Sequence, residues 1–170
     1  MAPERAASLA FAELSHQLRL DLRALEDEAA EIARGRSSTG GNPDAVWMAF
    51  LAVHLDRFYT AAEAAFERIA RTLGEPMPTG QQWHRILLHQ ATIPIQDVRP
   101  AVLSGSAEAQ LEPLFKFRHW LRHAYRAPFD WALMRAVVES VPDALLALRR
   151  DLTAFLAWLD TAAQNGTDHA

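Results

Sequence analysis

The stretch LSHQLRLDLRALEDEAAEI, residues 14–32, decides the fold class, because its apolar residues return every three or four positions. An α-helix has 3.6 residues per turn, so this spacing gathers the apolar side chains on one face. The stretch therefore predicts a long amphipathic helix over about residues 4–34. The residues of its apolar face are Leu14, Leu18, Leu22, Leu25, Ala29 and Ile32.

The segment RSSTGGNPD, residues 36–44, is the clearest break in this helical pattern. Asp44 is a suitable N-cap for a second helix, and Gly74 is a suitable stop, so this helix is expected to end at about Leu73. The residues predicted to form its buried stripe are Trp47, Phe50, Leu51, His54, Phe58, Ala62 and Phe66.

After the turn GEPMPTG, the sequence predicts a short helix around QQWHRILLHQ, residues 81–90. The following segment TIPIQDVRP, residues 92–100, contains two prolines, which exclude a regular helix. A longer helix is expected to begin near Ser106, where the cap signal is weak, and to end near Pro128.

The last helix is expected over about residues 129–161, with Pro142 kinking or splitting it. No stretch alternates apolar and polar residues in the manner of a half-buried strand. The predicted fold is all-α, an antiparallel helical bundle of four long helices plus a short helix. A single domain is expected over residues 1–165; the end of the chain, AAQNGTDHA, is expected to fray, with a tail at residues 166–170.

Length and composition narrow the function classes. The 170 residues suit a single domain, and the absence of cysteine excludes disulfides and thiolate chemistry and fits a cytoplasmic protein. The N-terminus does not resemble a secretory signal, and no apolar run is long enough to span a membrane. The net charge is −4, so any contact with nucleic acid is expected at a local site.

The stretch KFRHWLRHAYR, residues 116–126, is basic and contains no acid. On a helical wheel its Arg, His and Tyr side chains share one polar arc, whereas Phe117 and Trp120 face the core. A solvated helix face remains the alternative, but such a face usually mixes charges of both signs. The arc consists of Arg118, His119, Arg122, His123, Tyr125 and Arg126.

These side chains are the groups that a metal-independent ribonuclease needs. An imidazole can take the proton of a ribose 2′-OH near neutral pH, and a guanidinium can stabilise charge that develops on the phosphate. A tyrosine can position a phosphate or stack on a base. Arg118 and His123 lie about 140° apart on the wheel, so one chain places them awkwardly for a single phosphate. A symmetric dimer would supply a second copy of both residues across its two-fold axis.

The segment RHWLRHAY, residues 118–125, resembles the R-x4-H-x-Y signature of HepT-like toxins, which belong to the HEPN superfamily of small all-helical ribonucleases. The stretches WHRILL at 83–88, VRPAVL at 98–103 and FDW at 129–131 also look similar to that family. The likeness covers about residues 44–160, and the first helix matches only in character.

The resemblance implies a HEPN-like homodimer that cleaves RNA without a metal and leaves a 2′,3′-cyclic phosphate. It assigns Arg118 and His123 as catalytic and His119 as a supporting residue. It also implies a nucleotidyltransferase-type antitoxin as partner, which in some members attaches AMP to the motif tyrosine, here Tyr125. The helical wheel adds Arg122 and Arg126 as phosphate contacts. The alternative is a non-catalytic helical binding partner of a nucleotidyltransferase.

The other candidate sites carry weaker signals. His84 and His89 do not share a helix face, so no metal site is predicted, and the glycines at 38–42 lack the lysine of a phosphate loop, so no cofactor is expected. His54 is interpreted as a hydrogen-bonded core or interface residue. An acidic cluster is interpreted as a solvated face; the alternative is that it docks a basic partner or shields the basic motif of another copy. The cluster consists of Glu26, Asp27, Glu28 and Glu31. Core or interface packing is expected for Trp47, Trp83, Trp131 and Trp158.

Overall fold

The computed structural model describes residues 3–123 and 128–165, and this described part contains five helices and no strand. The predicted all-α class is therefore confirmed. Tyr125 and Arg126 lie outside the described residues. The helices are α1 (Pro3–Ser38), α2 (Ala45–Thr72), α3 (Trp83–Gln90), α4 (Gly105–His123) and α5 (Trp131–Asn165).

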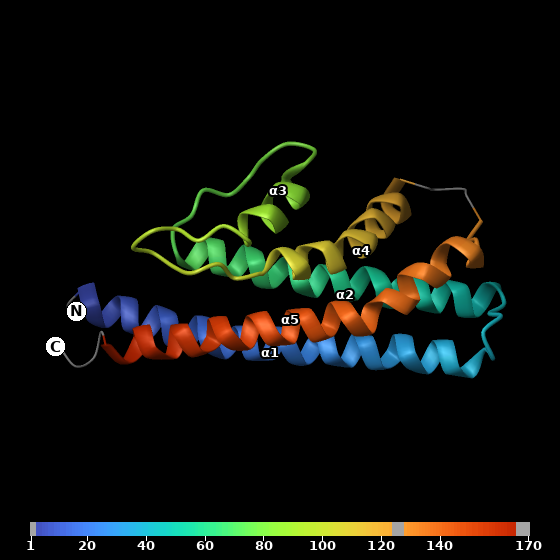
Figure 1. Ribbon diagram of the computed structural model, residues 1–170, viewed down its shortest axis with the longest axis horizontal. Coiled ribbons are helices and arrows are strands. Elements are labelled where there is room, and N and C mark those ends of the chain that lie inside the picture. Colours follow the sequence, from blue (N-terminus) through green and yellow to red (C-terminus); the bar gives the residue numbers. More distant parts are fainter. Residues whose placement is uncertain (1–2, 124–127, 166–170) are drawn as a thin grey trace.

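Helix α1 packs along both α2 and α5, and α4 packs on α5 and α2 (Figure 1). The short helix α3 contacts α2 and α4, and the first turns of α1 lie beside the last turns of α5. One core of apolar side chains runs between the helices. No helix in residues 3–123 or 128–165 has both the length and the apolar character to cross a membrane.

The predicted first helix is confirmed and continues to Ser38. Of its predicted apolar face, Leu14, Leu18, Leu25 and Ile32 are buried, whereas Leu22 and Ala29 are half-buried. Near its end the helix comes very close to α2 at Gly35. A Cβ atom there would lie 2.9 Å from Leu51 Cδ2 and 3.0 Å from Phe50 Cε1, so glycine allows the close approach.

The predicted limits of the second helix are also confirmed. The Asp44 carboxylate accepts a hydrogen bond of 2.9 Å from the backbone N–H of Trp47, which satisfies a free donor of the first turn. After the last turn Gly74 has φ +70°, a conformation that favours glycine. In the predicted stripe Leu51, Phe58, Ala62 and Phe66 are buried, whereas Trp47, Phe50 and His54 are half-buried.

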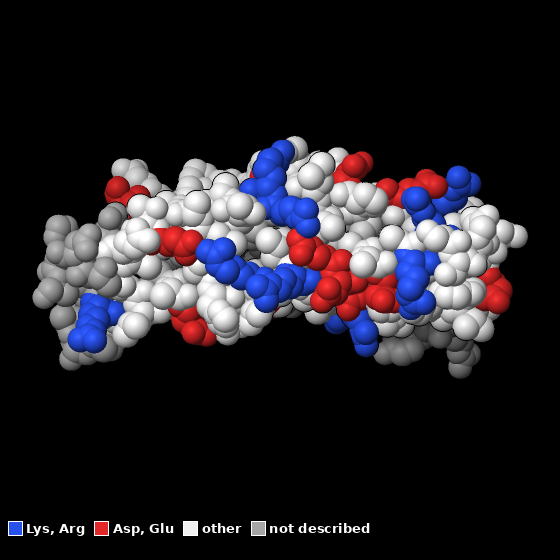
Figure 2. All heavy atoms as spheres, turned by 90° about the horizontal axis from the view of Figure 1, so that it is seen from below, with Lys and Arg blue, Asp and Glu red and all other residues white. Residues whose placement is uncertain are grey.

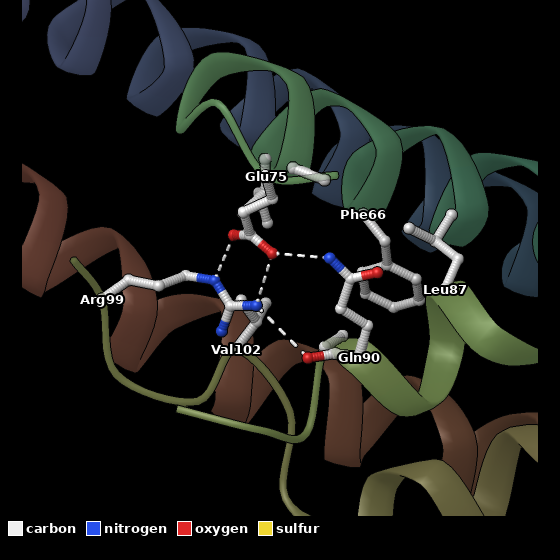
Figure 3. A pocket seen from close by; sticks show the side chains of 9 residues that line it. Phe66, Glu75, Leu87, Gln90, Arg99 and Val102 are labelled. Carbon is white, nitrogen blue, oxygen red and sulfur yellow. Dashed lines mark hydrogen bonds and ion pairs between the residues drawn. The ribbon is translucent and has the colours of Figure 1, made fainter. Parts of the chain in front are cut away.

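The segment between α3 and α4 is irregular, as its prolines predict, and a buried ion pair fixes it (Figure 3). Arg99 donates to the two carboxylate oxygens of Glu75 at 2.5 and 2.9 Å and to three backbone carbonyl oxygens. Gln90 donates to the same carboxylate at 3.0 Å. Burial opposes the charge of Glu75, but the hydrogen bonds from Arg99 and Gln90 outweigh it, so the pKa of Glu75 is lowered. This pair holds α3 against α2.

Helix α4 begins at Gly105, and its cap is Ser104 where the sequence suggested Ser106. The Ser104 hydroxyl accepts from the N–H of Ala107 at 3.2 Å and donates to Asp151 of α5 at 2.7 Å. The cap is therefore fixed by a contact between distant segments that local sequence does not reveal. The described part of α4 ends at His123, so the predicted end near Pro128 is not tested.

Helix α5 corrects the prediction for the C-terminal region. It continues through Pro142, so the predicted split is wrong, although the first turns rise away from the line of the rest (Figure 1). Val141 and Ala144 are buried on either side of the proline, and this packing keeps the helix continuous. Asp130 caps the helix by accepting from the N–H of Ala132 at 2.8 Å.

The helix also extends four residues beyond the predicted end at Thr161, to Asn165. The Ser8 hydroxyl of α1 donates to the carbonyl oxygen of Ala163 at 2.7 Å, a contact that supports the last turn. Fraying was therefore wrongly predicted for residues 162–165. The predicted tail at 166–170 lies outside the described residues.

Candidate active site

An open pocket of about 860 Å³ lies between the first turn of α3 and the C-terminal half of α4. Four of the six arc residues line it, and they come from successive turns of α4. The pocket is lined by Gly80, Gln81, Trp83, His84, Phe115, Arg118, His119, Arg122 and His123. The predicted residues Tyr125 and Arg126 are not described. The structure thus brings Arg118 and His123 to one pocket within a single chain, despite their separation on the wheel.

Arg118 is buried, with only 6% of its surface exposed, and is not on an open arc as predicted. It donates to Glu63 of α2 at 2.9 Å, and its Nε lies 3.6 Å from Asp56 Oδ1 and 3.5 Å from the Thr60 hydroxyl. The expectation of a site without counter-charge is therefore wrong. A helical wheel shows the residues of one helix only. The two acids near Arg118, Asp56 and Glu63, lie on α2, which packs against α4.

Asp56 lies between the two arginines of the pocket. Its Oδ1 is buried without a hydrogen-bond partner among the described residues and lies 3.8 Å from Nε of Arg122. Arg122 is half exposed, so its guanidinium reaches the open part of the pocket. Lys116, by contrast, pairs with Glu112 at 3.2 Å on the exposed side of α4 and does not line the pocket.

His119 and His123 are exposed one turn apart, with ring centroids 4.3 Å from each other. Nδ1 of His123 lies 2.7 Å from the carbonyl oxygen of His119, a contact in which Nδ1 carries the proton. This hydrogen bond leaves Nε2 of His123 for a ligand or for proton transfer. The predicted imidazole pair is therefore accessible from the pocket.

Two further residues of the site, Glu63 and His84, were not predicted. Glu63 is 4% exposed, and one carboxylate oxygen contacts Nδ1 of His84 while the other accepts from Arg118. The His84 ring packs on Trp83 with centroids 3.6 Å apart. A signal for Glu63 exists in the sequence: it lies next to Ala62 in the apolar stripe of the second helix, and a buried acid needs a partner.

The phenol of Tyr59 lies beneath this cluster. Its ring is 5.7 Å from the Arg118 guanidinium carbon, and 1% of the residue is exposed. Burial raises the pKa of Tyr59, the Glu63 charge raises it further, and the Arg118 charge only partly offsets them. Tyr59 therefore stays neutral, and its ring makes a cation–π contact with the Arg118 guanidinium.

Apart from Trp83 and His84, the other residues singled out from the sequence and described in the structure do not line the pocket. His54 is 12% exposed and its Nδ1 lies 2.5 Å from Glu28, which confirms the hydrogen-bonded core interpretation. Within residues 3–123 and 128–165 no group of three His, Cys, Asp or Glu side chains could hold a metal ion. The half-buried tryptophans that pack on the core are Trp83, Trp120, Trp131 and Trp158.

The acidic cluster on α1 is only partly a solvated face. Glu28 contacts His54, Glu26 contacts Arg149 of α5, and Glu31 accepts from Arg34 at 2.5 Å. Figure 2 shows this side of the molecule with acidic side chains gathered beside basic ones. The prediction of a solvated face is therefore wrong for Glu28.

Comparison with known proteins places the chain in a family. A family model described as HepT-like protein matches residues 50–159, more than half of the chain, including the pocket residues on α3 and α4. No curated protein and no solved structure matches the chain. The family suggests, in general terms, a HEPN-type ribonuclease of a toxin–antitoxin system, with an RNA target and an antitoxin partner. The chain belongs to the HepT-like family.

Proposed function

We propose that this protein is the toxin of a type II toxin–antitoxin pair and cleaves RNA internally at the pocket between α3 and α4. The observation that carries the proposal is that Arg118, His119, Arg122 and His123 all line this one pocket. Two guanidinium groups suit a phosphate, and imidazoles suit the proton transfers of ribose 2′-OH attack. Such cleavage leaves a 2′,3′-cyclic phosphate and needs no metal ion.

In this proposal each side chain has a separate task. Arg118 is held in place by Glu63 and directs its remaining donors to the phosphate, and Arg122 supplies a more mobile positive charge. His123 transfers a proton through Nε2. His119 packs against His123, and Arg126, which lies outside the described residues, is proposed from the sequence as a further phosphate contact. A homodimer with two such pockets facing each other fits the HepT-like expectation.

Control of the toxin is proposed to come from a nucleotidyltransferase-type antitoxin. AMP attached to Tyr125, two residues after the pocket residue His123 in the sequence, would add a phosphate and a base to the motif. Co-expression with the antitoxin is then expected to add one or more AMP units to the intact mass, and Tyr125→Phe is expected to remove them. Masses of the two proteins that differ only by the oxygen atom lost in the substitution would contradict the modification. A cytoplasmic location remains a prediction from the cysteine-free composition.

The test of the proposed function is RNA cleavage in a buffer that contains a chelator. Wild-type protein freed of antitoxin is expected to cleave, whereas Arg118→Ala and His123→Ala are expected to lose cleavage. His89→Ala is a matched control, because His89 is exposed on α3 outside the pocket. Full cleavage by both pocket variants, or dependence on a divalent metal, would contradict the proposal.

One observation favours a second candidate, a non-catalytic helical partner of a nucleotidyltransferase. Arg118 is buried and paired with Glu63, as expected for a residue that only holds α4 on α2. Such a protein would bind the nucleotidyltransferase tightly and never cut RNA after separation from it. The same cleavage assay, together with a binding titration, distinguishes the two functions.

A further inference from the structure

Glu63 connects two polar side chains of the pocket that come from different helices. Its Oε2 accepts from Arg118 of α4 at 2.9 Å, and its Oε1 contacts Nδ1 of His84 on α3. The carboxylate is almost completely buried, and its two oxygens contact these two side chains. One side chain of α2 thus fixes both a guanidinium and an imidazole.

The contact with Glu63 also decides which nitrogen of His84 faces the pocket. A carboxylate accepts and does not donate, so the proton of the contact lies on Nδ1 and the lone pair remains on Nε2. The His84 side chain is 21% exposed and lines the pocket, while Trp83 packs against its ring. A carboxylate behind Nδ1 orients an imidazole and stabilises the positive charge that it gains with a proton.

His89 shows that this arrangement is specific to His84. It lies on the same helix and its Nδ1 is 3.1 Å from Glu108, yet its side chain is 64% exposed and does not line the pocket. His123 differs in another respect, because its Nδ1 lies against a neutral backbone carbonyl. Only one of these three imidazoles combines a buried carboxylate partner with access to the pocket.

RNA cleavage by 2′-OH attack requires two proton transfers, and one imidazole can perform only one of them at a time. We propose, on the basis of the proposed function, that His84 is the general base and His123 is the general acid of this reaction. Nε2 of His84 accepts the 2′-OH proton as the 2′-oxygen forms its bond to phosphorus. The bond from phosphorus to the 5′-oxygen breaks, and that oxygen takes a proton from His123. Glu63 is a positioning residue that acts through His84 and Arg118.

The test compares two substrates. In the second substrate, sulfur replaces the 5′-oxygen at the cleaved bond, and a thiolate leaves without protonation, so a missing general acid matters little. His84→Gln and His123→Ala are each expected to lower kcat on natural RNA by about 10²- to 10⁴-fold. On the sulfur substrate His123→Ala recovers most of its activity, and His84→Gln does not. The control His89→Gln behaves as wild type on both.

The outcomes separate this inference from the proposed function. Natural cleavage at the wild-type rate by His84→Gln, or equal recovery of both variants on the sulfur substrate, would overturn the role of His84 and leave the ribonuclease proposal intact. Failure of the wild type to cleave RNA would contradict the proposed function and, with it, this inference. Thermal unfolding of each variant shows whether a loss of cleavage is a loss of the fold.

A second measurement tests Glu63 without catalysis. In Glu63→Gln the amide oxygen must face Arg118, because a guanidinium only donates, so the amide NH₂ faces Nδ1 of His84. The His84 proton is then expected to move to Nε2, the atom that should accept from RNA. ¹⁵N NMR of the histidine ring is expected to show the Nδ1–H tautomer in wild type and the Nε2–H tautomer in the variant. The same tautomer in both would overturn the positioning role.

Discussion

In the part of the chain that the structure describes, two buried Glu–Arg pairs have the same chemistry, and they differ in how many guanidinium nitrogens donate a hydrogen bond. In the Glu75–Arg99 pair every nitrogen of the guanidinium donates to a carboxylate or carbonyl oxygen, and the adjoining cavity is only about 10 Å³ (Figure 3). In the Glu63–Arg118 pair the described contacts of the guanidinium use Nε and one terminal nitrogen, beside a pocket of about 860 Å³. We call the Glu75–Arg99 pair saturated, because every guanidinium nitrogen donates a hydrogen bond, and this pair fixes a loop. We call the Glu63–Arg118 pair unsaturated, because one terminal nitrogen has no described contact and is available to a ligand in the pocket.

The largest expected effect comes from breaking the saturated pair. Arg99→Ala leaves Glu75 buried without its main partner, and we expect the free energy of unfolding to fall by about 3–5 kcal/mol. Urea unfolding measures this change, with the exposed Arg85→Ala as control. A change below about 0.5 kcal/mol, the size usual for surface substitutions, would contradict the structural role of the pair.

Breaking the unsaturated pair should affect activity more than stability. Arg118→Ala is expected to lower RNA cleavage by at least about 10²-fold, because a positioned donor to the phosphate is lost. Its cost in unfolding free energy should be smaller than that of Arg99→Ala, since Glu63 retains His84 and the site is open to water. Equal destabilisation of the two variants with unchanged cleavage would erase the difference between the pairs.

Acid should weaken the saturated pair in a predictable direction. The pKa of Glu75 is lowered in the folded protein, so its stabilising contribution is complete above the usual carboxyl pKa and is lost as the pH falls through the lowered value. Glu75→Gln should therefore be less stable than wild type at pH 7 and should lose less stability on acidification. The pKa of Asp151 is also lowered, so some acid sensitivity should remain. Parallel stability profiles of wild type and variant would contradict this assignment.

The smallest expected effect concerns the second helix, away from both pairs. Asp44→Ala removes the side-chain acceptor for the N–H of Trp47 and should cost about 1 kcal/mol of unfolding free energy. Asp44→Asn keeps an acceptor and should cost less. The unfolding temperature is expected to be highest for wild type, lower for Asp44→Asn and lowest for Asp44→Ala. A reversed order would contradict the role of Asp44 as the cap.

The fold was largely predictable because its signals are local. Apolar periodicity located α1 and α2, and Asp44 and Gly74 marked the ends of α2 within a residue or two. The predictions were wrong where contacts between distant segments determine where a helix begins or whether it continues. Ser104 caps α4 through Asp151, which lies 47 residues later, and buried neighbours carry α5 through Pro142.

Of the candidate site, the sequence predicted only the residues that lie on α4. The pattern on α4 identified Arg118, His119, Arg122 and His123, and these four residues do line one pocket. It did not identify Glu63 or His84, because a wheel shows only neighbours on the same helix. Glu63 is 55 residues from Arg118 and 21 from His84 in the chain. The acid missing from the basic stretch is thus present in the fold.

The most direct test of the central claim is whether RNA enters the pocket beside the unsaturated pair. A short RNA with a 2′-deoxy group at the cleavage position binds without being cut and can be titrated while histidine side-chain NMR signals are recorded. The signals of His84 and His123 should shift together and saturate, and those of the exposed His89 and His16 should not. Unmoved His84 and His123 signals at saturating RNA, or equal shifts of all four, would contradict the account.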